Sequence, residues 1–279
     1  MQTNSPYKDL YIYYIAGLPE AGSTDFDGDF IGNWQEDGFS FLFFSSPADE
    51  RIEQLVLHQP HLTLLDRYNM TYDEWQGEKL SPITIGGFLI VPPLEASHTA
   101  PVNGVKKIVL DPGVVFGTGM HPTTRDCLEA IERLCYKKKI HTVIDLGTGT
   151  GVLAIAAVCM GCRRVFAVDL NCLAVKTAQR NVLLNRLENN ISIIQGQGEE
   201  FIDKPADLVI ANIHYDIMKR LINTETFPAA QSFILSGLLK SQAREIDNIL
   251  GRLPVTILEK LEYDNIWHTF YGRMGYERV

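Results

Sequence analysis

The sequence predicts an α/β fold built on a mostly parallel sheet, and three observations carry that prediction. Apolar segments suited to buried strands alternate with helical segments from about residue 140 to residue 250. The glycine-rich turn 147–151 directly follows one apolar segment and opens a helical one. Two further strand segments, 255–261 and 266–271, have no helix between them. We therefore expect them to form a closing hairpin that adds one antiparallel strand to the sheet.

The glycine-rich turn is the centre of the predicted functional site. Val143–Leu146, which is three apolar residues and an acid, leads into it, and 152–160 reads as a small apolar helix. Glycines allow a tight turn and a close approach to a ligand, and a strand, turn and helix N-terminus together cradle nucleotides. The G-x-G-x-G spacing differs from the G-x-G-x-x-G that favours a pyrophosphate. Asp169 ends the strand 164–169, and its carboxylate is placed to accept hydrogen bonds from two ribose hydroxyls. The alternative interpretation of the whole motif is a generic glycine turn with a surface aspartate.

Residues 1–66 predict a small α+β domain with the order β-β-β-α-β. Its elements are strands at 7–15, 30–34 and 39–44, a helix capped by Ser46 with Pro47 at its first position, and a strand at 61–65. Residues 67–79 carry charges with interleaved aromatics and predict a connecting helix or linker, so that 80–279 forms the second domain. The small sheet has more aromatic surface than its own packing needs, at Tyr11, Tyr13, Phe41 and Phe43.

The second domain continues with alternating elements. They are strands at 84–91 and 107–110, a helix at 124–135, the strand 164–169, a helix at 172–185, strands at 191–194, 207–213 and 232–235, a turn at 236–237 and a helix at 241–250. Ligands bind beyond the carboxyl ends of parallel strands, where Gly147, Asp169 and Asn212 fall. On chemistry alone, Thr123 or Thr124 is best read as the N-cap of the helix that follows the loop 116–124.

Composition restricts the class of protein. With 279 residues, 46% hydrophobic and 21% charged, the chain has the material for one or two ordinary globular domains. The net charge of −9 argues against a large nucleic-acid footprint and permits a basic protein partner. The sequence has no secretory leader pattern and no apolar run of membrane-spanning length. Five cysteines without framework spacing favour a cytoplasmic location, and Cys159 and Cys162 read as packed thiols, so we expect no metal site.

Five segments carry a family resemblance: FGTGMHPTT (116–124), VIDLGTGTGVLAIAA (143–157), VFAVDLN (165–171), VIANI (209–213) and LSGLL (235–239). Together they resemble the S-adenosylmethionine-dependent methyltransferases of large-subunit ribosomal protein eleven. The resemblance runs from about residue 72 to residue 279, and the FGTG-x-HPTT loop is its specific part, since the glycine motif marks class I methyltransferases at large. It implies a Rossmann-like seven-stranded sheet, S-adenosyl-L-methionine as cofactor, and N-methylation of a ribosomal protein or a similar amino-group acceptor. We further expect a monomer with no membrane or direct nucleic-acid binding.

The resemblance also implies roles for individual residues. Thr124, Gly147, Asp169 and Asn212 match the family's cofactor contacts, and Gly149 and Gly151 complete the binding turn. Asn212 is the expected catalytic residue, because its amide would position the acceptor or the amino-acid end of the cofactor. For Thr124 this role partly replaces the N-cap reading.

The chain departs from the family in two places. The family's N-I-L-A is Asn-Ile-His-Tyr at 212–215 here. The family's longer β-α-β-β-α-β substrate-recognition domain has a first helix for which residues 1–66 lack room.

Four other classes compete with this interpretation. A nucleic-acid N-methyltransferase usually shows Asn-Pro-Pro-aromatic where 212–214 has neither proline. A dinucleotide oxidoreductase is disfavoured by the G-x-G-x-G spacing and the closing hairpin. A small-molecule methyltransferase fits everything after Gly113. A catalytically silent S-adenosylmethionine-binding protein fits the intact binding motif beside an altered acceptor pocket.

Overall fold

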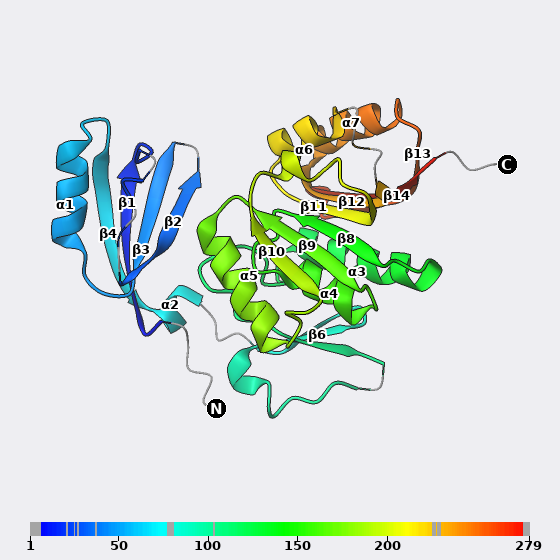
Figure 1. Ribbon diagram of the computed structural model, residues 1–279, viewed down its shortest axis with the longest axis horizontal. Helices are drawn as coiled ribbons and strands as arrows, with labels where there is room; N and C mark the ends of the chain where they lie inside the picture. The colour runs from blue at the N-terminus through cyan, green and yellow to red at the C-terminus, as the bar shows by residue number, and fades with distance from the viewer. Residues whose placement is uncertain are drawn as a thin grey trace. The chain divides into compact units, whose positions relative to one another are not determined.

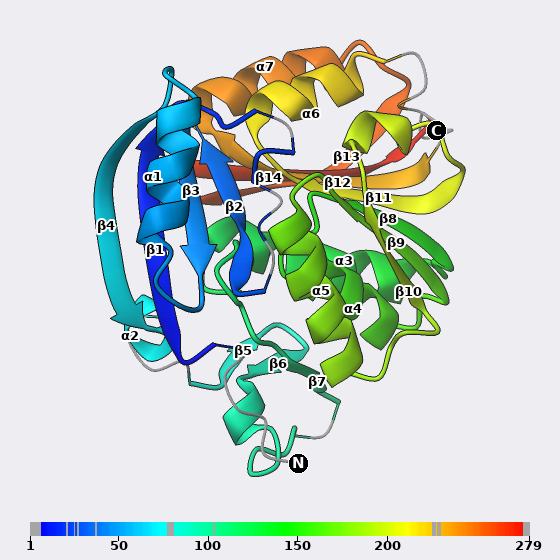
Figure 2. The same ribbon diagram turned by 60° about the vertical axis from the view of Figure 1, so that its left-hand side comes forward.

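The chain folds into two compact units, shown in Figures 1 and 2. The computed structural model describes residues 7–20, 22–24, 26, 28–36, 38–76, 81–102, 104–224, 227 and 230–275. One unit comprises Met1–Ser81 with Asn171–Leu173, and the other comprises Pro82–Leu170 and Ala174–Val279. Within the described part of the chain, no helix combines the length and the apolar character needed to cross a membrane.

The first unit is a four-stranded antiparallel sheet with one long helix on it. Its elements are β1 (Asp9–Ala16), β2 (Phe30–Glu36), β3 (Phe39–Phe44), α1 (Asp49–His58) and β4 (Thr63–Thr71), with α2 (Tyr72–Gln76) after the last strand. The strand order is β2-β3-β1-β4. Alternate residues of β1 and β3, among them Ile15 and Phe44, pack with Ile52 and Leu55 of α1. The predicted β-β-β-α-β order is present.

Two boundaries of this unit differ from the prediction. The helix starts at Asp49, two residues later than expected, and Ser46 does not cap it: its hydroxyl donates to the carboxylate of Asp29. Asp29 also accepts two hydrogen bonds from Arg51, and these bonds hold the Asp29 pKa at about 2. The last strand, predicted at 61–65, reaches Thr71 because it pairs with the whole length of β1. The first part of the expected connection at 67–79 is therefore strand, while 77–80 lie outside the described residues.

The second unit is built on a seven-stranded sheet with the order β10-β9-β8-β11-β12-β14-β13. Its strands are β8 (Thr142–Leu146), β9 (Arg164–Asp169), β10 (Ile191–Gln195), β11 (Ala206–Asn212), β12 (Ala230–Leu239), β13 (Val255–Tyr263) and β14 (Trp267–Met274). Strands β8 to β12 run parallel to one another, whereas β14 is antiparallel to both β12 and β13. The predicted seven-stranded, mostly parallel sheet with one antiparallel strand is confirmed.

Helices cover both faces of this sheet. They are α3 (Pro122–Lys137), α4 (Val152–Cys159), α5 (Cys172–Leu184), α6 (Tyr215–Ile222) and α7 (Lys240–Leu250). Successive residues of a strand point to opposite faces, so Val143 joins the core beneath α3 and α4 while Ile144 joins the core beneath α6 and α7. This is a three-layered arrangement with a core on each side of the sheet (Figure 1).

Two predicted elements of this unit are wrong. The single strand expected at 84–91 is a hairpin of β5 (Ile83–Ile85) and β6 (Phe88–Val91), and β7 (Lys106–Val109) completes a small separate sheet. Gly86 has a φ of +52°, which lets the chain reverse there. The turn expected at 236–237 does not end a strand, since β12 continues to Leu239 with an irregular register between Leu235 and Leu238.

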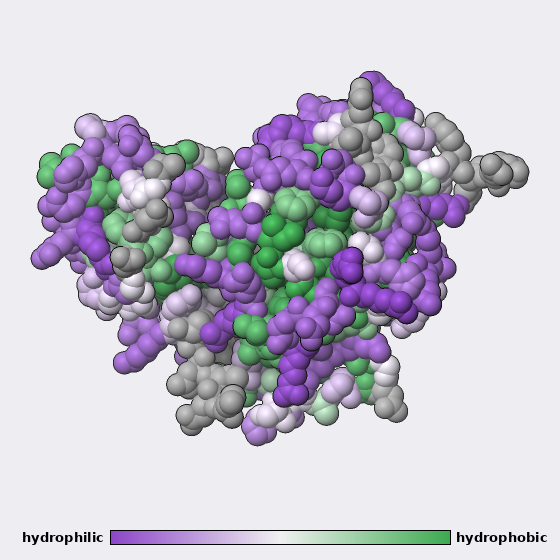
Figure 3. Space-filling model, viewed as in Figure 1, coloured by the Kyte–Doolittle hydropathy of each residue, from purple (hydrophilic) through white to green (hydrophobic). Residues whose placement is uncertain are grey.

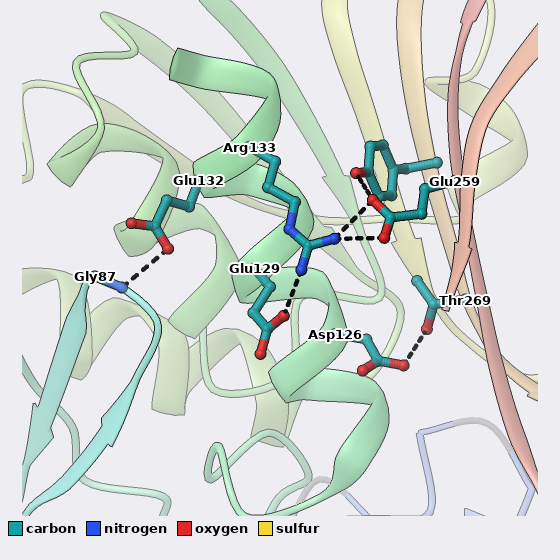
Figure 4. A network of polar contacts seen from close by, with 8 residues as sticks. Gly87, Asp126, Glu129, Glu132, Arg133, Glu259 and Thr269 are labelled. Carbon is teal, nitrogen blue, oxygen red and sulfur yellow. Dashed lines mark hydrogen bonds and ion pairs between the residues drawn. The ribbon is translucent and has the colours of Figure 1, made fainter. Parts of the chain in front are cut away.

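Helix α3 is fixed to its surroundings by charged side chains (Figure 4). Arg133 donates to Glu259 of β13 over 2.6 Å and to Glu129 over 3.1 Å, and Glu132 accepts from the Gly87 amide of the β5–β6 turn over 2.9 Å. Nearer the start of the helix, Asp126 accepts from Thr269 of β14 over 3.1 Å. These contacts fix the helix whose first turn carries the candidate site residue Thr124.

Candidate active site

The glycine-rich turn is hydrogen-bonded to the end of the neighbouring strand β9. The amides of Gly147 and Thr148 donate to the Val168 carbonyl over 2.9 and 3.0 Å. The Gly149 amide donates to a carboxylate oxygen of Asp169 over 2.9 Å. Gly147, Gly149 and Gly151 have φ values of +68°, +55° and +82°, which glycine adopts without strain. The predicted turn and the predicted acid thus form one connected group.

Thr150 joins this turn to the loop 116–124. Its hydroxyl donates to the Gly117 carbonyl over 2.7 Å, and its amide donates to the Phe116 carbonyl over 3.1 Å. A Cβ on Gly149 would lie 2.5 Å from that same Phe116 oxygen, so the approach of the two segments depends on glycine. Thr150 is fully buried. Two of the five segments that carry the family resemblance are therefore held against each other by one residue.

Asn181 of α5 joins the glycine-rich turn to the chain just before the loop 116–124. Its amide nitrogen donates to the carbonyls of Asp111 and Thr150 over 2.8 and 2.9 Å, and its oxygen accepts from the Asp111 amide over 2.8 Å. It is fully buried, and all three contacts are to backbone groups. Sequence analysis missed Asn181 and Thr150. The one pattern that pointed to Thr150 was its place between two motif glycines.

The N-terminus of α3 differs from the prediction. The cap is His121, whose Nδ1 accepts from the Thr123 amide, so the N-cap interpretation of Thr123 or Thr124 is wrong. Pro122 takes the first helical position, where its missing N–H costs nothing. The hydroxyl of Thr124 is buried and has no hydrogen-bond partner among the residues that the structure describes. An unpaired buried hydroxyl costs about 1–3 kcal/mol, so this oxygen is suited to a ligand.

Asn212 ends β11 at the same edge of the sheet. It pairs with Ser236 across the parallel ladder, and its side-chain oxygen lies 3.2 Å from where a Cβ on Gly237 would stand. A Cβ on Gly147 would lie 2.3 Å from the Cγ2 of Ile213. Glycines at 147 and 237 thus make room for the Asn212–Ile213 segment, which brings Asn212 to the same edge as the glycine turn.

Three rings lie together beside this edge. The His121 ring makes edge contacts with Phe116 and Trp267, at centroid distances of 5.1 and 4.8 Å. Burial lowers the pKa of His121, which favours its neutral form at neutral pH. Trp267 begins β14 and reaches this edge because that strand runs antiparallel to β12. Sequence analysis did not find Trp267. His214, by contrast, is exposed, and its Nδ1 lies 3.6 Å from Asp216.

One buried carboxyl group lies directly before the turn. Asp145 is fully buried in β8 and accepts from the Thr148 hydroxyl over 2.6 Å. Burial raises its pKa to about 7. The acid was visible in the sequence as part of the glycine motif, but its burial was not. Asp145 therefore lies beneath the glycine-rich turn, out of contact with solvent.

We expect Thr150→Val to loosen the site without changing its shape. The substitution leaves the Gly117 carbonyl buried without its donor, which should lower the free energy of unfolding by about 1–3 kcal/mol. Urea denaturation followed by circular dichroism measures this change. Thr118→Val is the matched control, because the Thr118 hydroxyl accepts only from the exposed Met120 amide, and we expect less than about 0.5 kcal/mol there. Equal effects of the two substitutions would contradict the role assigned to Thr150.

The comparisons with known proteins decide the family. Residues 48–274 match the family model described as ribosomal protein L11 methyltransferase. The chain belongs to this family. A ribosomal protein L11 methyltransferase of Staphylococcus aureus is 33% identical over 248 residues, covering 84% of this chain and 77% of that protein. One of Anoxybacillus flavithermus is 38% identical over 190 residues, covering 67% of this chain and 59% of that relative's own length.

The family match agrees with a solved structure. The crystal structure of the ribosomal protein L11 methylase of Lactobacillus delbrueckii subsp. bulgaricus has a TM-score of 0.63 and 29% sequence identity, covering 71% of this chain and all of that one. The resemblance found in the five sequence segments is confirmed, and so is the class I methyltransferase fold.

Proposed function

We propose that this member of the ribosomal protein L11 methyltransferase family is an S-adenosylmethionine-dependent N-methyltransferase that acts on an amino group of a ribosomal protein. One observation carries the proposal: Thr150 holds the family-specific loop 116–124 against the glycine-rich turn at the carboxyl edge of the sheet, and Asn181 fixes Thr150. Asp169 and Asn212 lie at this same edge. The glycine-rich turn alone would be compatible with any class I methyltransferase, so the loop 116–124 is what makes the proposal specific.

The residues at this edge fit S-adenosylmethionine. Asp169 offers a carboxylate to ribose hydroxyls, Thr124 offers a buried hydroxyl without a partner among the described residues, and the glycines allow the backbone to approach the ligand closely. We assign cofactor binding to these residues, Thr124, Gly147, Gly149, Gly151, Asp169 and Asn212. When bound, the cofactor supplies an electrophilic methyl group.

The protein's own contribution is placement and desolvation. Holding the reacting groups in line can lower the barrier by up to about 7–11 kcal/mol. An acceptor lysine must lose its proton, which costs about 4–5 kcal/mol at pH 7 from a reference pKa near 10.4. The rings of Phe116 and Trp267 would exclude water from the amine and lower its pKa. With its pKa lowered in this way, the amine would lose its proton to solvent, and the mechanism needs no dedicated base. His121 instead uses its Nδ1 toward Thr123 and organises the loop.

We expect Asn212→Ala to lower turnover more than cofactor affinity. The amide stands at the end of β11 next to Ile213, where we place the acceptor amine, and its loss removes an orienting hydrogen bond. Methyl-transfer rates should fall by about 10²-fold, the typical cost of a misplaced reacting group, while calorimetry shows less than a tenfold change in S-adenosylmethionine affinity. Asn212→Asp tests whether an acceptor oxygen suffices. Retained turnover with collapsed affinity would move Asn212 to the cofactor side.

We assign substrate capture to the N-terminal domain, residues 1–66. The aromatic surface there differs from the one expected from sequence. Tyr13 belongs to the core of its own sheet, and its hydroxyl accepts from the Ala48 amide, while Phe43 is also buried. Tyr14 and Phe41 instead stack at 4.6 Å and 8° with both rings partly exposed. This stacked pair is the part of the sheet that supports a docking role.

Labelling separates the candidate functions. Purified ribosomal protein L11 is incubated with methyl-tritiated S-adenosylmethionine and either the full chain or a chain that begins at Pro82, the start of the second unit. We expect the full chain to label the protein, and the shortened chain to bind the cofactor normally but leave the protein unlabelled. Equal labelling by both would remove the capture role from residues 1–66. Cofactor binding without labelling of any protein in a methyl-deficient lysate would favour a small-molecule enzyme or a silent binding protein.

A further inference from the structure

Six cations gather at the amino edge of the large sheet, opposite the candidate active site. The basic edge, as we call it, consists of Lys137, Lys138, Lys139, Arg163, Arg164 and Arg186. They lie in or directly beside the three connections that precede β8, β9 and β10, since Lys137 ends α3 and Arg164 begins β9, and all six residues are exposed. In Figure 3 hydrophilic side chains cover the end of α3 in this region.

Backbone contacts fix these connections to one another. The amides of Arg163 and Arg164 both donate to the His141 carbonyl, over 2.9 and 3.0 Å. The Asn190 side chain donates to the Arg163 carbonyl over 3.2 Å, and the Val165 amide donates to the Asn190 carbonyl over 2.8 Å. These bonds join the connections before β8, β9 and β10, so the cations are carried by connections that are fixed to one another.

Most of these charges have no acidic partner. Within the described ranges, none of the six cations lies within 4.0 Å of a carboxylate, whereas Lys219, Arg220 and Lys260 elsewhere in the chain all form ion pairs. Lys137 and Lys138 lie close enough to Glu259 and Asp207 to lower the pKa of those carboxyl groups, and Lys138 also donates to the Gln231 side chain over 2.5 Å. The other four cations, which are Lys139, Arg163, Arg164 and Arg186, favour an anionic partner even in a chain of net charge −9.

The apolar side chains near the basic edge favour a nucleic acid over an acidic protein as its partner. A protein interface needs a desolvated apolar centre, and the large exposed apolar side chains next to the basic edge are Tyr136 and, farther along, Leu183. Tyr136 is 73% exposed and directly precedes the three lysines. An exposed ring among cations that track a phosphate backbone is the arrangement that binds single-stranded nucleic acid, with the ring stacking on a base.

We propose that the basic edge binds single-stranded RNA, at a surface separate from the site of methyl transfer. The cations contact phosphates without reading sequence, and Tyr136 stacks on an unpaired base. The proposal does not depend on the identity of the methyl acceptor, since Gly147, Asp169 and Asn212 lie at the opposite ends of the same strands. A bound RNA would leave the cofactor and acceptor positions open.

The test uses the full chain and a fluorescein-labelled 20-nucleotide poly-uridine RNA, with anisotropy measured from 50 to 200 mM KCl. For six phosphate contacts on a single strand, we expect log K to fall with log salt at a slope of about −4. Lys137→Gln/Lys139→Gln/Arg163→Gln should weaken binding about 100-fold at 0.1 M KCl and reduce the slope to about −2. Tyr136→Leu should weaken it about fivefold or more.

The control variant Lys219→Gln/Arg220→Gln/Lys260→Gln changes the net charge equally but removes cations that already form ion pairs. We expect it to bind RNA within about twofold of the wild type, because each of these cations is compensated by its own carboxylate partner. Calorimetry with S-adenosylmethionine checks that each variant is folded. No RNA binding by the wild type at 50 mM KCl, or equal losses in both triple variants, overturns the proposal. Two other outcomes also overturn it. One is that poly-glutamate binds as tightly as the RNA and Tyr136→Leu has no effect, and the other is that the chain binds only to phosphatidylserine vesicles.

Discussion

Gly147→Ala is expected to collapse cofactor binding. The residue has a φ of +68°, where an alanine is strained by about 1–3 kcal/mol, and its Cβ would lie 2.3 Å from the Cγ2 of Ile213. Relieving that overlap costs about 1–3 kcal/mol more and displaces the segment that carries Asn212. We expect the free energy of unfolding to fall by about 2–6 kcal/mol in total. Urea denaturation and calorimetric titration with S-adenosylmethionine measure the two effects.

Two variants separate the causes of this loss. Gly161→Ala has a similar backbone cost, since its φ is +100°, but a Cβ there meets nothing within 4 Å. It should therefore lose stability without losing cofactor affinity. Ile213→Ala in the Gly147→Ala background removes the colliding methyl group and should restore part of the affinity. If Gly147→Ala behaves like Gly161→Ala, the close approach of Ile213 has no role in the site.

Asp169→Ala is expected to weaken S-adenosylmethionine binding by about 10- to 150-fold, which corresponds to about 1.5–3 kcal/mol for hydrogen bonds to a charged group. The structure adds a second reason for a large effect, because the carboxylate also accepts from the Gly149 amide over 2.9 Å. Asp169→Asn distinguishes the two contributions, since it keeps an oxygen for Gly149 and loses the charge. Unchanged affinity in Asp169→Ala would remove this residue from the cofactor site.

The local part of the site could be predicted from the sequence, because the residues concerned are close together in the chain. Gly147 follows its strand directly, and Asp169 ends the next strand, so chain order alone places both at one edge. The roles of Trp267 and Asn181 required the fold. Trp267 reaches His121 only through the antiparallel course of β14, and Asn181 reaches Thr150 only once α5 packs. Neither contact leaves a periodic pattern in the sequence.

Errors in the predicted elements have local physical causes. At 84–91 the apolar residues suggested one strand, but Gly86 reverses the chain within it. At 236–237 the Ser-Gly pair suggested a turn, whereas Ser236 is fully buried and hydrogen-bonds with Thr269 across the β12–β14 pair. The whole-chain charge says nothing about how charges are distributed, because a net value of −9 includes six exposed cations in or beside the connections before β8, β9 and β10.

The antiparallel course of β14 determines when the site can become complete during synthesis. The residues assigned to the cofactor lie between Thr124 and Asn212, but the Trp267 ring is translated about 55 residues later. At about 5–20 residues per second that interval lasts about 3–11 s. In that interval a nascent chain would present the cofactor turn without the aromatic wall beside it. Such a chain could hold S-adenosylmethionine before it could position an amine, so methyl transfer would await the pairing of β14 with β12.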